Sequence, residues 1–332
     1  MNVLSLFDGM SCGQIALNRI GIKPNKYYAS ELDKYAIKVT QANYPNTIQL
    51  GDVIKWREWD IDWSSIDLLI GGSPCQGFSF AGKQLAFDDP RSNLFFVYVN
   101  ILNYIRSVNP DVRFLLENVR MKREYLDIIS EHLGVEPVFI NSALVSAQNR
   151  QRYYWANWEF GQPEDNGIVL ADIIEHGVVD RDKSWCIDAN YFKGGNLKSY
   201  FEKHRRQLVF CGAMRGRYIV DGKRQDGKMS VAGMTKQRIE VRYDGKTNAL
   251  TTVSKDNNIV YEADGTPHYD VSDIKFRKLT PIECEALQTV PDNYTAHVSN
   301  TQRYKMLGNG WTVDVIAHIF NQGIKRGALC QR

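Results

Sequence analysis

The sequence lacks the features that mark several common classes of protein. Its six cysteines, at 12, 75, 186, 211, 284 and 330, form no Cys-x-x-Cys pair and no metal-ligand spacing. This usage is typical of a reducing compartment, with no disulfide framework and no zinc site. No apolar run approaches the ~20 residues of a membrane span, and the first residues lack the basic region and apolar core of a secretion signal. We therefore expect a cytoplasmic protein with no membrane segment and no metal.

Two phosphate-binding motifs are also missing. The first glycine turn, Gly9–Gly13, does not fit Gly-x-Gly-x-x-Gly, and no Gly-x-x-x-x-Gly-Lys-[Ser/Thr] occurs. A dinucleotide therefore fits poorly, and a P-loop is absent. The 332-residue chain, with 43% hydrophobic and 24% charged residues, is otherwise ordinary for a globular protein. It is long enough for one large domain and a smaller one.

Three short segments near the N-terminus are each expected to form a strand that ends in a polar turn. Residues 3–7 lead into the glycine turn that opens a helix, residues 26–30 precede Glu31, and a third strand over 47–53 carries Asp52 at its end. Carboxylates at strand ends accept hydrogen bonds from ribose hydroxyls and amino groups. S-adenosylmethionine fits this pattern, since it has an adenosine and a positive charge but no phosphate. The alternative for each acid is a loop cap or a surface charge.

The stretch from Asp67 to Ser79 combines an apolar run with a stiff turn and a thiol. Residues 68–70 predict a buried strand, and the Gly-Gly-Ser-Pro turn displays Cys75 at its end. Such a cysteine is either a nucleophile or a small buried hydrophobic residue. Residues 76–93 predict a mobile loop beside the thiol.

A second candidate group follows another apolar strand, residues 112–119, which ends in Glu117. Strand ends of a parallel sheet share one edge, so Glu117 should lie near Cys75 as an acid partner. Downstream, the alternation of Gln148, Arg150 and Arg152 predicts three polar groups on one strand face. One of these arginines could hold a carbonyl or a phosphate in the site.

The charge of the chain is unevenly distributed. Residues 193–255 contain 15 Lys or Arg and 5 Asp or Glu, whereas the rest of the chain has a net charge of −7. A basic module on an acidic body favours a polyanion as partner, although a solvated surface is the alternative. Six basic residues have the composition of phosphate-contacting loops: Arg205, Arg206, Arg215, Arg217, Lys223 and Arg224.

The C-terminal part predicts two helices. Thr280, Pro281 and Glu283 form a helix start, and Gly308–Trp311 is a second glycine turn that opens a helix. We expect an α/β protein with three regions: a catalytic cofactor-binding domain over 1–158, a basic recognition domain over 159–275, and a hinge helix and C-terminal helix over 276–332 that return to the first domain.

Taken in order, the motifs resemble those of DNA cytosine-5 methyltransferases. They are Phe7-Asp-Gly9 with Gly13, Ser30-Glu31, Gly51-Asp52-Val53, Gly72-Ser-Pro-Cys75-Gln, Glu117-Asn-Val, Gln148-x-Arg150-x-Arg152, Arg277-x-Leu-Thr-x-x-Glu283 and Gly308-Asn309. The ordered set is highly specific and spans residues 3 to about 320, apart from the basic segment. Asp8 and Trp311 are similar to the mammalian de novo branch. Gln76 and the loop to Arg91 resemble the bacterial enzymes.

The resemblance implies a doubly wound Rossmann-like methyltransferase fold with a smaller inserted target-recognition domain. It implies that Cys75 attacks C6 of a cytosine flipped out of the duplex, that Glu117 binds N3 and the exocyclic amine, and that Arg152, with Arg150, holds the base carbonyl. The cofactor is S-adenosylmethionine, released as S-adenosylhomocysteine. Its site comprises Phe7, Asp8, Gly9, Cys12, Gly13, Glu31, Leu32, Asp52, Val53, Pro74, Leu94, Asn309 and Trp311. Gln76, Ser79 and Arg91 join the six basic residues above as DNA contacts.

Partners and alternatives follow from the same resemblance. We expect double-stranded DNA as substrate, a cognate restriction endonuclease, a monomeric enzyme, and a bacterial or phage origin with the protein at the nucleoid. Two alternatives stay open. A tRNA cytosine-5 methyltransferase shares the catalytic set, and a catalytically silent DNA-binding regulator would keep the basic module.

Overall fold

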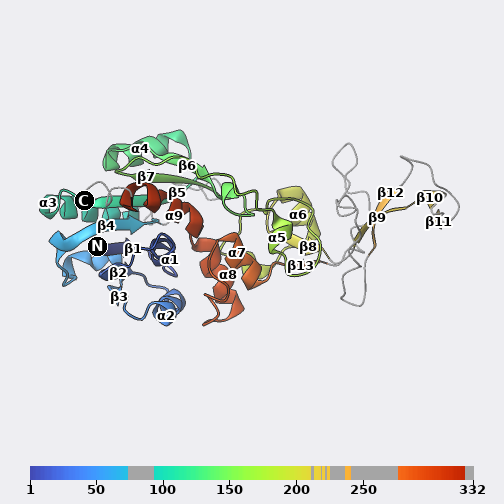
Figure 1. The fold of residues 1–332 in the computed structure, drawn as a ribbon, viewed down its shortest axis with the longest axis horizontal. Coiled ribbons are helices and arrows are strands. Elements are labelled where there is room, and N and C mark those ends of the chain that lie inside the picture. Colours follow the sequence, from blue (N-terminus) through green and yellow to red (C-terminus); the bar gives the residue numbers. More distant parts are fainter. Residues whose placement is uncertain are drawn as a thin grey trace.

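The structure is a computed structural model that describes residues 1–73, 93–210 and 276–325, and the backbone of four further strands, β9 to β12. Its centre is a seven-stranded sheet with helices on both faces (Figure 1). The strands are β1 Asn2–Leu6, β2 Lys26–Ser30, β3 Ile48–Gln49, β4 Ile66–Gly71, β5 Arg113–Val119, β6 Val138–Asn141 and β7 Gln151–Ala156. Their order, β3-β2-β1-β4-β5-β7-β6, confirms the predicted doubly wound α/β fold.

The directions of the strands bring the ends of four of them to one edge. Strands β3, β2, β1, β4 and β5 are parallel, and β7 runs antiparallel between β5 and β6. Parallel strands end at the same edge, so the turns after β1, β2, β4 and β5 meet there. Strand β7 begins at this edge, where Arg152 pairs in register with Val119. The antiparallel strand thus adds its first residues to the polar edge.

Each face of the sheet has its own hydrophobic core, because alternate strand residues point to opposite sides. In β1, Val3 belongs to the core that includes residues of α1 and α9, whereas Leu4 belongs to the core of α3 and α4. Full burial of a large apolar side chain contributes about 1.5–3 kcal/mol to stability, so the packing of both layers holds this edge of the sheet in place.

The helices of the body are α1 Cys12–Arg19, α2 Lys34–Asn43, α3 Asn93–Val108, α4 Arg123–Leu133, α7 Pro281–Leu287, α8 Asn300–Asn309 and α9 Val313–Phe320. Shorter helical turns are η1 Val53–Glu58, η2 Trp63–Ser65, η4 Ser142–Leu144 and η7 Asn321–Lys325.

The third strand is shorter than the sequence predicts. Strand β3 covers only two residues, because Gly51 has a left-handed backbone (φ +73°) that turns the chain. Asp52 then caps η1 by accepting a hydrogen bond from the Ile54 amide at 3.0 Å. The prediction of a strand that continues to Val53 is therefore wrong, although Asp52 still follows its end.

The prediction that Gln148, Arg150 and Arg152 share a strand face is also wrong. Strand β7 begins after the first two of these residues, which lie in a buried connection. The Gln148 side chain accepts a hydrogen bond from the Ile187 amide at 2.8 Å and donates one to the Leu287 carbonyl at 3.2 Å. Side-chain bonds to distant backbone, together with an isolated parallel bridge between Gln148 and Ser184, thus fix the conformation before β7.

The predicted helix start at Thr280 is confirmed in α7. The Thr280 hydroxyl accepts a hydrogen bond from the Glu283 amide at 3.1 Å, the Glu283 carboxylate accepts one from the Thr280 amide at 2.7 Å, and Pro281 occupies the first turn. Arg277 forms an ion pair with Glu283 at 2.7 Å and also donates to the His176 carbonyl. Through these two contacts, Arg277 ties α7 to the segment after β7.

A smaller unit follows the sheet toward the other end of the molecule in Figure 1. It has its own core, formed by Leu197, Tyr200, Leu208 and Phe210. Its elements are α5 Leu170–Ile173, η5 Tyr191–Lys193, α6 Leu197–Lys203 and β8 Leu208–Phe210, which pairs antiparallel with β13 Phe276–Lys278. Beyond it, β9 Ala213–Arg217 pairs with β12 Lys236–Glu240, and β10 Ile219–Val220 pairs with β11 Lys223–Arg224. In the described ranges, no helix is both long and apolar enough to cross a membrane.

Candidate active site

A cavity of about 520 Å³ opens at the carboxyl edge of the sheet. The turns after β1, β2, β4 and β5 form its wall, together with η1, the start of α3 and the segment between α8 and α9. Eleven predicted cofactor residues line it: Phe7, Asp8, Gly9, Cys12, Glu31, Leu32, Asp52, Val53, Leu94, Asn309 and Trp311. The predicted catalytic residues Glu117, Arg150 and Arg152 line it as well.

The charged side chains that line this cavity are mainly acidic. The described wall contains five carboxyl groups but only two cationic side chains, those of Arg150 and Arg152. Both arginines already bond to protein atoms. The cavity therefore suits a ligand that carries positive charge and no phosphate. The carboxyl groups belong to Asp8, Glu31, Asp33, Asp52 and Glu117.

Glu31 connects the first two turns of the cavity wall. One carboxylate oxygen accepts a hydrogen bond from the Gly9 amide at 2.8 Å, and the other accepts bonds from the amides of Leu32 and Asp33 at 2.7 and 2.8 Å. Gly9 has a φ of +60°, so the turn that presents its amide requires a left-handed backbone. Three amide donors thus hold this carboxylate at the cavity wall.

Two exposed aliphatic side chains flank the acidic wall. Leu32 is 68% exposed and Ile54 is 65% exposed, although both are large and apolar. Apolar groups that stay exposed at the mouth of a polar cavity are suited to cover a flat ring. Asp52 lines the same cavity, oriented by its bond to the Ile54 amide.

Asp8 and Cys12 have protonation states that burial controls. The Asp8 carboxyl accepts a hydrogen bond from the Tyr27 hydroxyl at 2.8 Å, and its desolvation raises its pKa to about 6. Desolvation also raises the pKa of the Cys12 thiol to about 12, so this thiol stays protonated and donates to the Trp311 carbonyl. Cys12 therefore lines the cavity as a neutral group and is no candidate nucleophile.

Glu117 and Arg152 form the central ion pair of the site. Arg152 Nε lies 2.8 Å from Glu117 Oε1, and the two side chains are 14% and 12% exposed. Glu117 comes from the end of β5 and Arg152 from the beginning of β7, so the antiparallel pairing of these strands brings them together. The pair presents an acceptor and a cation side by side at the cavity.

The second oxygen of Glu117 has a partner that sequence reasoning missed. The Trp311 indole N–H donates a hydrogen bond to Glu117 Oε2 at 3.1 Å. Gly72 makes room for this contact, because a β-carbon there would lie 2.9 Å from both Glu117 Oε2 and Trp311 Nε1. In the sequence, Trp311 was a cofactor contact implied by the family resemblance, and nothing linked it to Glu117.

Arg150 acts on the backbone around the cavity. Its guanidinium donates to the carbonyls of Ile187, Gly308 and Gly310 at 3.2, 3.2 and 2.8 Å, and the residue is 3% exposed. These bonds fix the turn that carries Trp311. The prediction that Arg150 helps to hold a base carbonyl stays a prediction, and the observed bonds give it a positioning role.

Gly13 is not one of the residues that line the cavity. It lies in α1, where a β-carbon would come 2.7 Å from the Tyr27 hydroxyl. Its lack of a side chain lets the helix pack closely against the sheet.

The segment that leads to Cys75 is described only to Ser73. Ser73 is 4% exposed, and its hydroxyl accepts a hydrogen bond from the Asn118 side chain at 3.2 Å. This bond anchors the approach to the thiol beside the strand that ends in Glu117. Pro74, Cys75, Gln76, Ser79 and Arg91 lie outside the described residues, so their predicted roles stay predictions.

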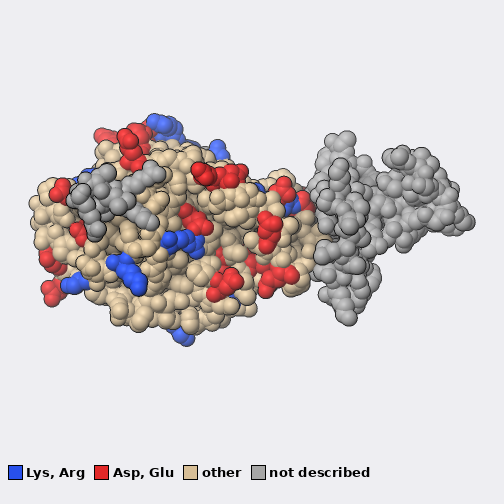
Figure 2. All heavy atoms as spheres, in the orientation of Figure 1, with Lys and Arg blue, Asp and Glu red and all other residues tan. Residues whose placement is uncertain are grey.

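The six basic residues that are predicted to contact DNA lie in the smaller unit and in the strands beyond it. Arg205 forms an exposed ion pair with Asp188 at 3.2 Å, and Arg206 donates to the Gly194 carbonyl at 2.9 Å. Arg215 and Arg217 lie on β9, and Lys223 and Arg224 form β11. Figure 2 shows acidic side chains over the region of α5, α7 and α8, as the net negative charge outside the basic segment predicts.

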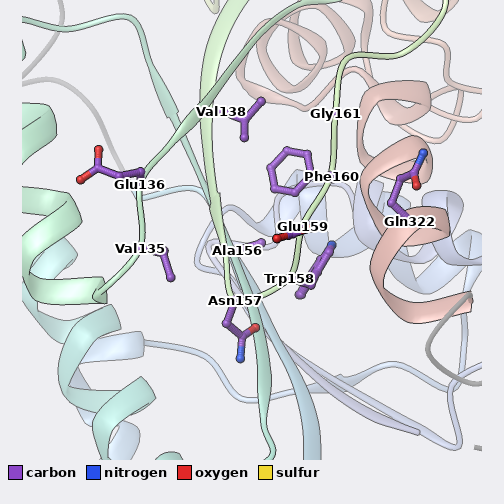
Figure 3. Close-up of a pocket in the computed structure, with 10 residues that line it drawn as sticks. All are labelled: Val135, Glu136, Val138, Ala156, Asn157, Trp158, Glu159, Phe160, Gly161 and Gln322. Carbon is purple, nitrogen blue, oxygen red and sulfur yellow. The ribbon is translucent and has the colours of Figure 1, made fainter. Parts of the chain in front are cut away.

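A second hollow, of about 900 Å³, lies at the opposite edge of the sheet (Figure 3). It is lined by residues around the start of β6 and the end of β7 and by Gln322 of η7. These are the strand ends at the edge opposite the turn after β5. Glu136, Glu159 and Phe160 contribute to it, and the indole N–H of Trp158 donates a hydrogen bond to the Ile319 carbonyl at 3.1 Å.

Within the part of the chain that the structure describes, no group of three or more His, Cys, Asp or Glu side chains is arranged to hold a metal ion.

Comparisons with known proteins agree with this architecture. The chain is 30% identical over 329 residues to the type II methyltransferase M1.ScrFI of Lactococcus lactis subsp. cremoris, covering 95% of this chain and 75% of that protein. It is 28% identical to the type II methyltransferase M.HpaII of Haemophilus parainfluenzae, covering 94% and 86%. The solved structure of the Entamoeba histolytica methyltransferase EhMeth has the same fold, with a TM-score of 0.60, 16% identity and 97% coverage of both chains.

The family assignment rests on almost the whole chain. The family model described as C-5 cytosine-specific DNA methylase matches residues 1–325. This span includes the sheet, the cavity and the segment that contains Cys75. The chain therefore belongs to the family of C-5 cytosine-specific DNA methylases.

Proposed function

We propose that the protein transfers a methyl group from S-adenosylmethionine to C5 of a cytosine flipped out of duplex DNA, with Cys75 as the covalent nucleophile. The single observation that carries the proposal is the ion pair of Glu117 and Arg152 at the cavity. It lies beside the segment, ending at Ser73, that continues directly to Cys75. A carboxylate and a guanidinium at this sheet edge, with a thiol two residues after Ser73 in the sequence, support a site for cytosine activation.

The cavity fits S-adenosylmethionine. Its five carboxyl groups suit a cationic ligand, and the exposed Leu32 and Ile54 suit its adenine ring. Glu31 and Asp52 would bind the ribose hydroxyls and the adenine amino group. When bound, the cofactor supplies an electrophilic methyl group. The residues proposed to hold it are Phe7, Asp8, Gly9, Cys12, Glu31, Leu32, Asp52, Val53, Pro74, Leu94, Asn309 and Trp311.

The protein groups would act on the base in sequence. The Cys75 thiolate adds to C6, which makes C5 nucleophilic, while Glu117 binds N3 and the exocyclic amine and Arg152 holds the base carbonyl. After C5 is methylated, it loses its proton, and elimination breaks the bond between C6 and sulfur and restores Cys75. Glu117 is suited to its part, since Arg152 and Trp311 hold both of its oxygens in fixed positions.

The basic segment would supply the DNA contacts. We propose a catalytic domain over 1–158, a target-recognition domain over 159–275 and a returning hinge and C-terminal helix over 276–332. Support comes from the core, in which residues of α7, α8 and α9 pack with those of α1. The proposed DNA-binding residues are Gln76, Ser79, Arg91, Arg205, Arg206, Arg215, Arg217, Lys223 and Arg224.

The biological setting is part of the same proposal. The relatives M1.ScrFI and M.HpaII are named type II methyltransferases, and the name of a phage relative, M.SPRI of Bacillus phage SPR, calls it an orphan methyltransferase. We propose a monomeric protein acting at the nucleoid of a bacterium or on phage DNA, with a cognate restriction endonuclease as partner.

The test is bisulfite sequencing of duplex DNA after incubation with the protein and S-adenosylmethionine. We expect 5-methylcytosine at one recurrent sequence with the wild type and none with Cys75→Ala. A parallel incubation with tRNA tests the RNA alternative. Methyl transfer to tRNA but not to DNA would contradict the proposal, and sequence-specific binding without any transfer would indicate a regulator.

A further inference from the structure

Trp311 occupies an unusual place in the site, because its indole N–H points at the carboxylate that is proposed to bind the base. The bond from Trp311 Nε1 to Glu117 Oε2 is 3.1 Å long. The other oxygen, Oε1, lies 2.8 Å from Arg152 Nε. A neutral donor and a cation thus hold one carboxylate from two sides.

The surroundings of Trp311 are built to keep this geometry. Arg150 donates to the carbonyls of Gly308 and Gly310 just before the tryptophan, and the Cys12 thiol donates to the Trp311 carbonyl. Gly72 leaves the space in which the indole meets the carboxylate, since a β-carbon there would come 2.9 Å from each polar atom. Segments from five parts of the chain therefore converge on one hydrogen bond.

We propose that Trp311 is a positioning residue for the catalytic carboxylate, and that it acts in activating cytosine rather than only in binding the cofactor. The inference rests on the proposed function and deepens it. A hydrogen bond to a charged acceptor restricts the rotation of the carboxylate, so that its remaining lone pairs face the cavity. An indole does this without adding a second positive charge beside the base.

The chemistry offers a readout that does not need the cofactor. Addition of Cys75 to C6 makes C5 nucleophilic, so C5 takes up a proton from water, and loss of the original hydrogen followed by elimination restores cytosine. Exchange of tritium from [5-³H]cytosine in duplex DNA therefore reports activation of the base alone. The dissociation constant of S-adenosylmethionine, measured separately by calorimetry, reports the cofactor contact.

Three variants separate the donor from the bulk of the side chain. Trp311→Phe keeps an aromatic ring but loses the N–H, whereas Trp311→His keeps an N–H at the matching position of a five-membered ring and loses the second ring. Trp158→Phe is the matched control, because it removes an indole N–H that bonds only to the Ile319 carbonyl at the opposite edge. Melting temperatures check that each variant is folded.

We expect Trp311→Phe to slow cofactor-free exchange about 10- to 100-fold, the usual effect of losing a hydrogen bond to a charged group. Trp311→His should stay within about threefold of the wild type, and Trp158→Phe should match it. Wild-type exchange by Trp311→Phe, or an equal loss in the phenylalanine and histidine variants, would overturn the proposal. A change confined to cofactor affinity would also overturn it.

A spectroscopic measurement keeps the inference testable if Trp311→Phe does not fold. In protein labelled with [¹⁵N]tryptophan, the Trp311 indole N–H resonance should move when Glu117 is replaced by Gln, while that of Trp158 should not. An unmoved Trp311 resonance would contradict the contact. If the wild type shows no exchange on duplex DNA, the proposed function fails instead, and the resonance still decides whether Trp311 holds Glu117.

Discussion

Gly308 in α8 lies directly against the backbone of Asp188, in the loop before η5. A β-carbon on Gly308 would overlap the backbone of Asp188 and of Ala189. Arg150 strengthens this junction, because its guanidinium donates hydrogen bonds to the carbonyls of both Ile187 and Gly308. The junction joins the smaller unit to the helix that ends beside the cavity.

Gly308→Ala should therefore destabilise the protein. Backbone atoms cannot move aside as a flexible side chain would, so we expect the free energy of unfolding to fall by about 1–3 kcal/mol. Gly161→Ala is the matched control, since no atom lies within 4 Å of the β-carbon it adds. Urea unfolding of both variants measures the effect, and equal stabilities would contradict the close packing at Gly308.

Arg150→Ala and Arg152→Ala should fail in different ways. Arg150 is the donor for three backbone carbonyls and is 3% exposed, so its loss should lower the free energy of unfolding by about 3 kcal/mol or more. Arg152 faces the cavity with Glu117, so its loss should instead slow methyl transfer about 10²- to 10⁴-fold. Thermal unfolding and single-turnover methylation distinguish them. A large loss of stability in Arg152→Ala, with slow methyl transfer but normal stability in Arg150→Ala, would contradict the roles assigned to the two arginines.

The buried Asp8 carboxyl should lower the free energy of unfolding as the pH rises from about 4 to 6. Desolvation raises its pKa from 3.8 to about 6 in the folded protein, so between these values the folded state holds a proton that the unfolded state has released. The contribution of neutral Asp8 is fully present below pH 4 and is lost as the pH rises through 6. Asp8→Asn should remove this slope and stabilise the protein above pH 6 by up to about 3 kcal/mol relative to wild type. Equal pH dependence of unfolding in both proteins would contradict the burial of a titrating Asp8.

Binding to DNA should depend steeply on salt. If the basic segment over 193–255 contacts six or more phosphates, affinity should fall by roughly 10³ or more between 50 and 200 mM salt. Fluorescence anisotropy with a labelled duplex measures the slope. A flat response would contradict the assignment of this segment to the DNA backbone.

The sequence was sufficient for the features that depend on local pattern and on sheet topology. Glu31 and Glu117 follow apolar strands, and the rule that parallel strands end at one edge places both at the cavity. The capping box at Thr280 was likewise readable, because all of its partners lie within four residues. These predictions need no knowledge of distant contacts.

The remaining features depend on contacts between distant parts of the chain. From the sequence, Arg150 was a candidate to hold a carbonyl or a phosphate in the site. Only the fold shows that its guanidinium bonds to carbonyls of the turn before Trp311. The bond between Trp311 and Glu117 joins residues 194 positions apart, and no local pattern encodes it. The early end of β3 had a local cause, Gly51, whose left-handed backbone outweighed the apolar pattern around it.

The central claim is that Cys75 forms a covalent bond with cytosine in duplex DNA. A duplex that contains 5-fluorocytosine at the methylated position tests it most directly, because C5 then carries fluorine in place of the proton that a base must remove before elimination, so the adduct persists. In the presence of S-adenosylmethionine, we predict a stable complex whose cross-linked peptide, identified by mass spectrometry, carries the base on Cys75. An adduct on another residue, or methylation of cytosine with no adduct at all, would contradict the account.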